Sequence, residues 1–139
     1  MDCQNLRDDP AAESPGAQPR RILAAVSDLL FASKISAAAK QLGLPVEFFR
    51  EKEKLFQAAA NTPAIVLVDL NNITLDPIEL IASLKANPST QPAQVIGYVS
   101  HVQHGRRREA EKAGCDLVLP RSVFSQNLIE LLRQHSCHI

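Results

Sequence analysis

The chain has 139 residues, of which 45% are hydrophobic, and this suits one domain with a single sizeable core rather than two full domains. Its 15 lysines and arginines balance 15 aspartates and glutamates, so the zero net charge argues against nucleic acid or an anionic membrane as a partner. No stretch approaches the ~20 uninterrupted apolar residues of a membrane span. The first residues lack a signal-peptide pattern, so we expect a cytoplasmic protein.

The two ends of the chain differ in composition from the part between them. Residues 1–19 contain acids, prolines and a glycine but few large apolar groups, so burial cannot offset the entropy lost on ordering them. We therefore expect a disordered leader at 1–19, one domain at 20–134 and a short tail at 135–139. The cysteines, Cys3, Cys115 and Cys137, are odd in number and widely spaced, which favours reduced thiols over a disulfide framework.

Short apolar runs alternate with longer amphipathic stretches from Arg21 onward, a pattern typical of repeated βα units. The first strand is expected at 22–26. A helix follows, because apolar residues recur four, three and four positions apart and Gly43 can then end the helix in a left-handed conformation. These apolar residues are Phe31, Ile35, Ala38 and Leu42. The second strand is expected at 46–49 and the second helix at 51–60.

The third strand, at 64–68, is the most continuous apolar run and should be central in the sheet. Asp76 and Pro77 form a suitable N-cap and first-turn pair for the third helix, and Asn87 before Pro88 marks its end. The sequence therefore predicts a helix directly after the loop that follows the third strand.

The last two βα units are predicted with weaker helical patterns. The fourth strand is expected at 95–99 and is followed by a polar helix at about 105–113. After the fifth strand, at 117–119, one helix is indicated by the spacing of Phe124, Leu128 and Leu131. Ser122 and Ser125 are candidates for its cap.

Five βα units of this length favour a three-layer α/β sandwich around a parallel five-stranded sheet in the order 2-1-3-4-5. In such sheets the ligand crevice lies beyond the carboxyl ends of the strands, at the point where the winding reverses. That point falls between strands one and three, so Asp28 and Asp69 are expected close together at this crevice.

Asp69 is the leading candidate for a functional residue. It ends the most continuous apolar run, so its carboxylate should project from a rigid strand into the mouth of the crevice. The alternative is a structural role, in which Asp69 caps the following turn and Asn71 and Asn72 complete an Asx turn.

Residues 64–80, AIVLVDLNNITLDPIEL, resemble the phosphoacceptor strand and loop of bacterial response-regulator receiver domains. The resemblance extends in element order from Arg21 to Gln134 and includes AGCD at 113–116, where receivers usually carry Ala-Gly-Ala-Asp. It implies the flavodoxin-like receiver fold. It also implies that Asp69 accepts a phosphoryl group from a histidine kinase, with a magnesium ion neutralising the charge that develops.

The resemblance is incomplete at the metal site. Receivers place an acidic pair directly after strand one, where this chain has Val26 and Ser27, and Asp28 comes one residue late. The candidate metal ligands are therefore Asp28, Asp69 and Asn71, and magnesium binding should be absent or weak. Asp28 has an alternative role as the N-cap of the helix that follows it.

Two further positions also depart from the receiver pattern. The Ser or Thr that receivers use as a switch falls at Val99 or at Ser100, depending on the register. Arg121 stands where receivers have a lysine, and Pro120 precedes it, so the cis-proline turn after that lysine is lost. Arg121 could pair with Asp69 or contact a phosphate together with Ser100, although a planar guanidinium does not reproduce the contact of an ammonium.

Three adjacent arginines open the fourth helix and are candidates for a partner surface: Arg106, Arg107 and Arg108. In receivers the face formed by helix four, strand five and helix five docks partners, and it could also join two copies of this chain. The alternative is a solvated helix face on which Glu109 and Glu111 pair with the arginines.

We expect a non-enzymatic, stand-alone signalling and interaction domain of a two-component-type pathway. Its metal and phosphorylation site would be degenerate, and its partners would be proteins such as a histidine kinase or a downstream effector. Too few residues follow Gln134 for an attached output domain. The alternatives are a phosphorylation-competent single-domain regulator that relays phosphate through Asp69, and a small crevice-binding enzyme with Asp69 as general base.

Overall fold

The computed structural model describes residues 21–60, 64–72, 75–100 and 104–136. Its sheet has five parallel strands in the order β2-β1-β3-β4-β5, as predicted. The strands are β1 (Arg21–Ala25), β2 (Val46–Phe48), β3 (Ala64–Asp69), β4 (Gln94–Val99) and β5 (Leu117–Pro120). The predicted leader at 1–19 lies outside the described residues.

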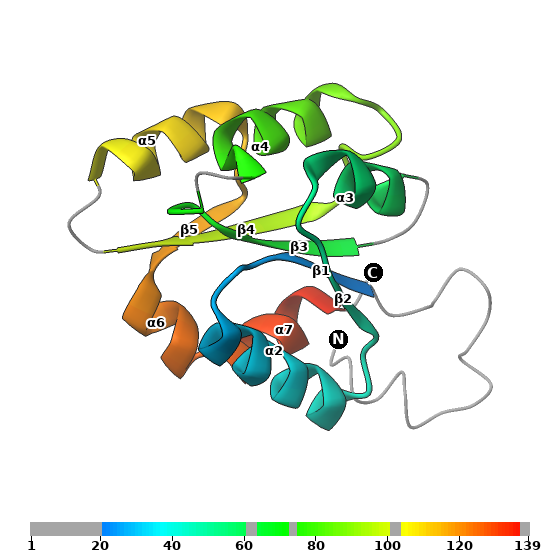
Figure 1. Ribbon diagram of the computed structural model, residues 1–139, viewed down its shortest axis with the longest axis vertical. Coiled ribbons are helices and arrows are strands. Elements are labelled where there is room, and N and C mark those ends of the chain that lie inside the picture. The colour runs from blue at the N-terminus through cyan, green and yellow to red at the C-terminus, as the bar shows by residue number, and fades with distance from the viewer. Residues whose placement is uncertain (1–20, 61–63, 73–74, 101–103, 137–139) are drawn as a thin grey trace.

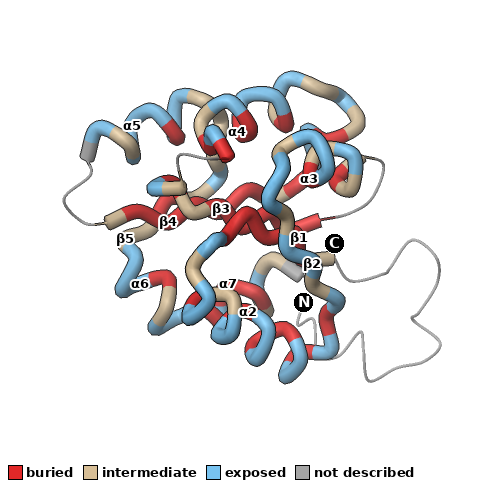
Figure 2. The backbone as a smooth tube through the Cα atoms, viewed as in Figure 1, coloured by how far each residue is buried: buried red, intermediate tan, exposed pale blue. Residues whose placement is uncertain are grey.

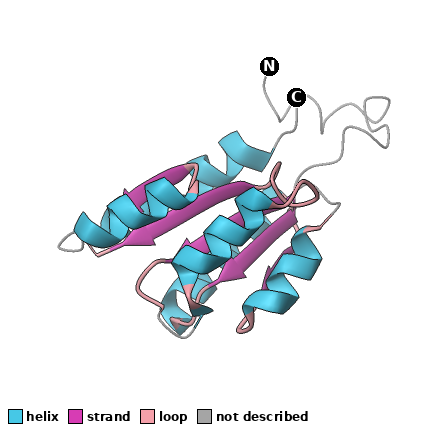
Figure 3. Ribbon diagram, turned by 90° about the horizontal axis from the view of Figure 1, so that it is seen from above, coloured by secondary structure: helices cyan, strands magenta, loops and turns pink. Residues whose placement is uncertain are grey.

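Helices cover both faces of the sheet and run alongside its strands (Figures 1 and 3). One layer contains α3 (Lys52–Ala59), α4 (Pro77–Ala86) and α5 (His104–Ala113). The other contains α2 (Leu29–Leu42), α6 (Arg121–Gln126) and α7 (Leu128–Ser136). The three-layer arrangement predicted from the sequence is confirmed. Among the described residues, none of the helices combines the length and apolar character needed to cross a bilayer.

Each face of the sheet has its own hydrophobic core, because neighbouring residues of a strand point to opposite faces. Ile22, Ile65 and Ile96 pack beneath α2 and α7, whereas Leu23 and Val66 pack beneath α3 and α4. The central strands β1 and β3 are consequently buried along nearly their whole length (Figure 2). Their uninterrupted apolar runs are the pattern expected of strands covered on both sides.

The predicted helix ends agree with the structure in position but not always in mechanism. Gly43 ends α2 with φ 71°, a left-handed conformation that glycine adopts without a steric penalty. Asp76 stands at the N-cap of α4, but its φ is 50° and its carboxylate makes no capping hydrogen bond, contrary to prediction. That carboxylate lies instead 3.8 Å from the ammonium of Lys52.

The prediction of a single fifth helix is wrong, because the segment forms two helices, α6 and α7, separated at Asn127. The backbone of Asn127 departs from helical geometry, with φ −111° and ψ 17°, and its side-chain amide donates to the carbonyl of Val123 at 2.9 Å. Ser122 and Ser125 are not caps: Pro120 occupies the N-cap of α6, and the Ser125 hydroxyl accepts a hydrogen bond from Lys34 at 2.8 Å. The helix α7 continues to Ser136, so the first residues of the expected tail are helical.

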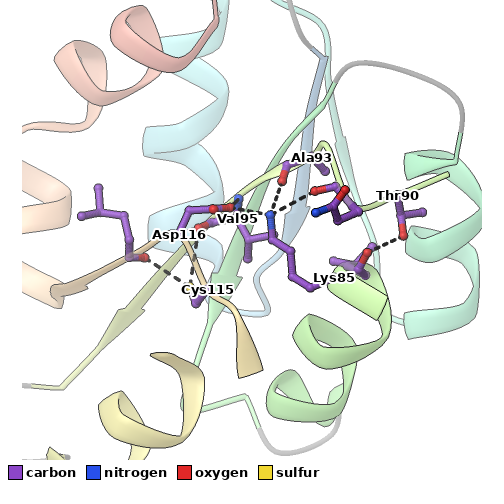
Figure 4. A network of polar contacts seen from close by, with 9 residues as sticks. Lys85, Thr90, Ala93, Val95, Cys115 and Asp116 are labelled. Carbon is purple, nitrogen blue, oxygen red and sulfur yellow. Dashed lines mark hydrogen bonds and ion pairs between the residues drawn. The ribbon is translucent and has the colours of Figure 1, made fainter. Parts of the chain in front are cut away.

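A polar network joins α4, β4 and β5 at the edge of the sheet where these strands begin (Figure 4). The Lys85 ammonium contacts the Asp116 carboxylate at 2.7 Å and donates to the carbonyl of Ala93 at 2.7 Å. Asp116 also accepts the N–H of Val95 at 2.8 Å. Gly114, with φ 109°, lies so close to Lys85 that an added Cβ would be 2.8 Å from the lysine Cγ. The network therefore fixes the starts of both strands against α4.

Candidate functional site

The candidate site lies where β1 and β3 end. The strand β1 pairs with β2 on one side and with β3 on the other, so the winding of the chain reverses at this point. Asp69 is the last residue of β3, and Asp28 precedes α2 shortly after β1 ends. The predicted juxtaposition of the two acids follows from this parallel register.

Asp69 is half-buried and forms the turn that the sequence suggested as its structural role. Its Oδ1 accepts the N–H of Asn71 at 2.9 Å, and its carbonyl accepts the N–H of Asn72 at 3.0 Å. Burial raises the pKa of Asp69, because leaving water penalises the charged form, whereas the Asn71 N–H and the charge of Arg121 oppose this rise. The carboxylate thus reaches the crevice with one oxygen already engaged.

Asp28 is the N-cap of α2, which confirms the alternative role considered for it. Its Oδ1 accepts the N–H of Leu30 at 2.8 Å and that of Phe31 at 3.3 Å. Its Oδ2 forms an ion pair with the guanidinium of Arg121. The Leu30 N–H is the main cause that holds the pKa of Asp28 below its ordinary value, and Arg121 adds to the effect.

Arg121 is the first residue of α6 and follows β5 directly. The partner of its guanidinium is Asp28, whereas the sequence had suggested Asp69 or a phosphate. The guanidinium carbon also lies 4.4 Å from the centre of the Phe31 ring, within range of a cation–π contact. An acid from α2, a cation from α6 and an aromatic ring therefore form one unit at the rim of the crevice.

Ser100 and Asn71 connect β4 to the turn after β3. The N–H of Ser100 donates to the Asn71 Oδ1 at 3.1 Å. The Ser100 side chain lines a pocket of about 360 Å³ together with Phe31 and Arg121. Val99, the other candidate for the switch position, is 4% exposed and packs in the core beneath α4 and α5. Of the two candidates, Ser100 is the one at the crevice.

Solved receiver domains have the same fold as this chain. The receiver domain of a sensor histidine kinase from Pseudomonas aeruginosa, solved with a magnesium ion coordinated in its active-site cleft, is 18% identical, with a TM-score of 0.70 over 84% of this chain and 96% of that one. A response regulator from Hahella chejuensis is 13% identical, with a TM-score of 0.71 over 81% and 92% of the two chains. A chemotaxis response regulator of Vibrio cholerae is 14% identical, with a TM-score of 0.69 over 83% and 97%.

The chain has the receiver-domain fold. At these identities the likeness establishes the architecture, and the chemistry of the site has to be argued from the residues present. No family model and no curated protein matches the sequence.

The oxygen ligands at this edge of the receiver fold do not fit a magnesium ion as they are arranged. Both Asp28 oxygens are engaged, by backbone N–H groups and by Arg121, and the Asn71 Oδ1 accepts the N–H of Ser100. The other oxygen of Asp69 accepts none of the hydrogen bonds found among the described residues. Magnesium requires several oxygens in near-octahedral geometry. Among the described residues, no group of three or more His, Cys, Asp or Glu side chains is placed to hold a metal ion.

Two aromatic residues of the site were not recognised from the sequence as part of it. Phe31 was predicted as a core residue of its helix, which the structure confirms, but its ring also contacts the guanidinium of Arg121. Tyr98 is 1% exposed, lies between Phe31 at 4.9 Å and Phe124 at 4.6 Å, and its hydroxyl has no hydrogen-bond partner among the described residues. Burial raises the pKa of Tyr98. The sequence signal that could have placed Phe31 at the site was its position three residues after Asp28, the candidate N-cap.

The three arginines proposed as a partner surface lie on α5, in the helix layer opposite α2. Arg107 pairs with Glu111 at 3.5 Å, so the solvated-face alternative applies to at least this residue. Arg108 is exposed and Arg106 is half-buried. Cys115, next to the polar network, is half-buried, and burial raises the pKa of its thiol to about 11, so it is not a candidate nucleophile.

Proposed function

We propose that this protein is a receiver-like signalling and interaction domain of a two-component-type pathway, with a degenerate metal and phosphorylation site. The observation that supports the proposal is the ion pair between Arg121 and Asp28, held over the Phe31 ring beside Asp69. In this pair Arg121 neutralises Asp28, the acid that would otherwise be available to a metal ion. A phosphoacceptor site instead needs an exchangeable divalent cation there.

The same contacts explain why phosphorylation should be inefficient. To bind magnesium, Asp28 would have to give up either Arg121 at Oδ2 or the backbone N–H groups that it caps at Oδ1. Breaking such a contact costs free energy, which lowers the affinity for magnesium. Val26 and Ser27 stand where receivers have an acidic pair, and they provide no carboxylate that could replace Asp28. The Arg121 guanidinium is also already committed to Asp28, so it is not poised to contact a phosphoryl group on Asp69.

Output in this proposal comes from binding another protein. The candidate surface is the face of α5, where Arg106 and Arg108 form none of the ion pairs found among the described residues. Its partner would be a histidine kinase or a downstream effector with an acidic surface, or a second copy of the chain bound through α5, β5 and the helices that follow. Neutralising Arg106, Arg107 and Arg108 to glutamine should weaken partner binding and make it less sensitive to salt.

A phosphorylation-competent regulator remains the second candidate, because Asp69, at the end of β3, and Ser100, directly after the adjacent strand β4, lie at one crevice and are linked through Asn71. In that case Arg121 would move from Asp28 to the phosphoryl group. A crevice-binding enzyme is the third candidate, and it would use Asp69 as general base.

Beryllofluoride with magnesium, which mimics an aspartyl phosphate, separates the first two candidates. We expect no change in the NMR amide signals of the Asp69 loop of the wild-type protein, and no difference from Asp69→Asn. Saturable changes centred on Asp69, absent in Asp69→Asn, would contradict the degenerate site and support the competent regulator.

A repaired variant makes this experiment decisive. Ser27→Asp restores an acid directly after strand one, and Arg121→Lys restores the ammonium and removes the guanidinium that pairs with Asp28. The double variant should gain a magnesium- and beryllofluoride-dependent response that the wild type lacks. If the double variant is folded and still does not respond, Arg121 and the missing acid are not what impairs the site.

A further inference from the structure

Exposed apolar side chains gather at the carboxyl edge of the sheet. Four large hydrophobic residues of the described chain are markedly exposed, and each lies where a strand ends or where a helix begins after one. Leu29 and Leu30 open α2, Phe48 ends β2, and Val123 lies in the first turn of α6, with exposures of 82%, 62%, 40% and 37%. Leaving such groups in water is unfavourable, so this edge favours a ligand that covers them.

A pocket of about 520 Å³ lies at this edge, between the ends of β1 and β2 and the first turn of α2. Its apolar wall consists of Val26, Leu29, Ala32, Phe48 and Phe49. Phe49 is fixed in this wall, because it packs on the core beneath α3 and its N–H donates to the carbonyl of Ala24 at 2.9 Å. The volume is in the range of pockets that hold small molecules, and most such pockets have this apolar character.

Three polar residues complete the lining: Ser27, Arg50 and Asn72. Arg50 is exposed and forms none of the ion pairs found among the described residues. The acids next to lining residues in sequence are paired with other cations: Asp28 with Arg121, Glu47 with Arg21 and Glu51 with Lys54. The charge that the pocket itself offers is therefore the single positive charge of Arg50, and its complement is a single negative charge.

We propose that this pocket binds a small amphipathic carboxylate, with its aromatic or branched body against Leu29, Phe48 and Phe49 and its carboxylate on Arg50. A guanidinium matches the planar carboxylate with two parallel hydrogen bonds. The Ser27 hydroxyl and the Asn72 amide add donors beside it. Binding would cover Leu29 and Phe48 and give the domain a chemical input separate from Asp69. It does not depend on the signalling role proposed above.

Phenylacetate is a suitable probe, and phenylacetamide is its matched neutral control. Titrations followed by NMR amide shifts should show saturable phenylacetate binding, with the largest shifts at residues 26–32, 48–50 and 72. The affinity for phenylacetamide should be lower than that for phenylacetate by about tenfold or more, as expected for the loss of a charge-assisted hydrogen bond. Equal affinity for the two probes, or shifts centred elsewhere on the protein, would overturn the assignment.

Two exposed residues allow the proposal to be tested without disturbing the core. Arg50→Gln should reduce phenylacetate affinity to that of the amide and leave phenylacetamide binding unchanged. Leu29→Ser should weaken both ligands, because it removes apolar wall and leaves the charge in place. An Arg50→Gln protein that still discriminates between the two ligands would contradict the role of Arg50.

The main competing occupant is a second copy of the chain. Sedimentation that depends on concentration for the wild type and not for Leu29→Ser, together with no phenylacetate binding, would assign the pocket to a dimer contact and overturn the proposal. Because none of these measurements uses beryllofluoride or a protein partner, failure here is distinguishable from failure of the proposed signalling function.

Discussion

Asp28 and Asp69 are the same residue type at the ends of neighbouring strands, yet their surroundings shift the two pKa values in opposite directions. Asp28 accepts two backbone N–H groups and pairs with Arg121, which stabilise its charged form. Asp69 is half-buried and receives less compensation, so burial raises its pKa. The acid that resembles a phosphoacceptor is therefore the one whose charge the fold stabilises less.

This difference predicts a pH-dependent effect of Asp69→Asn. The folded protein binds the Asp69 proton more tightly than the unfolded chain, whose pKa is near 3.8. As pH rises through the interval between these two pKa values, the free energy of unfolding of the wild type falls. Asparagine removes this loss and keeps an oxygen for the Asn71 N–H. We expect Asp69→Asn to be the more stable of the two proteins at pH 7.

Urea denaturation of both proteins at several pH values tests this expectation. The advantage of Asp69→Asn should shrink as pH falls and disappear below about pH 3.8, where Asp69 is protonated in both states. An advantage that does not change with pH would show that the charge of Asp69 is not its cause.

At the scale of elements, the sequence predicted the helices and strands whose apolar pattern lies within the element itself. The helix α2 has a regular apolar spacing and ends at Gly43, and β3 is an unbroken apolar run, so both were found. The division between α6 and α7 was not found, because it depends on the backbone conformation of a single residue, Asn127, which no apolar pattern marks. The apolar residues Phe124, Leu128 and Leu131 keep the spacing of one helix although they belong to two.

The start of α2 offers a test of the capping role of Asp28. Asparagine is as good an N-cap as aspartate, so Asp28→Asn removes only the ion pair with Arg121, whereas Asp28→Ala removes the cap as well. We expect Asp28→Ala to lower the Tm by several degrees and Asp28→Asn by less than half as much. Equal losses, measured by circular dichroism, would assign the stabilisation to the ion pair instead of the cap.

Gly114 and Gly105 form a matched pair for testing the polar network at the opposite edge of the sheet. Alanine at Gly114 would be strained by φ 109° and would press on Lys85, so we expect a loss of about 2 kcal/mol or more in the free energy of unfolding. At Gly105, in α5, an added Cβ meets nothing within 4 Å, and Gly105→Ala should be neutral or stabilising by up to about 1 kcal/mol. Similar effects of the two substitutions would contradict the close approach of Lys85.

At the scale of the molecule, two cores share one sheet. A strand such as β3 sends Ile65 and Leu67 to one core and Val66 and Val68 to the other, so neither core can come apart without loosening the strands of both. This coupling predicts a single cooperative unfolding transition.

Tyr98, the only tyrosine in a chain without tryptophan, reports on the core beneath α2 and α7. Leu132→Ala weakens that core, and Leu80→Ala weakens the other, and each should reduce the free energy of unfolding by about 2–5 kcal/mol. In both variants, tyrosine fluorescence and far-ultraviolet circular dichroism should give one coincident transition. If Leu80→Ala does not shift the unfolding transition reported by Tyr98 fluorescence, the two cores unfold separately.

The strand order and the three layers could be predicted because alternation of strands and helices, and the handedness of their connections, leave few arrangements. The site could be predicted only in part. The register of parallel strands placed Asp69, Asp28 and Ser100 at one edge, but which acid Arg121 contacts depends on how α6 leaves β5 and where Phe31 lies. Contacts between side chains far apart in sequence carry no periodic signal.

The Lys85–Asp116 network and the crevice lie at opposite edges of the sheet, and the two cores fill the space between them. Residues at the crevice edge can therefore be exchanged without touching the contacts that anchor the strand starts. A library that randomises positions 27, 29, 48, 50 and 100 would retain a folded scaffold in most of its members, so this chain offers a compact framework on which new binding specificities can be selected.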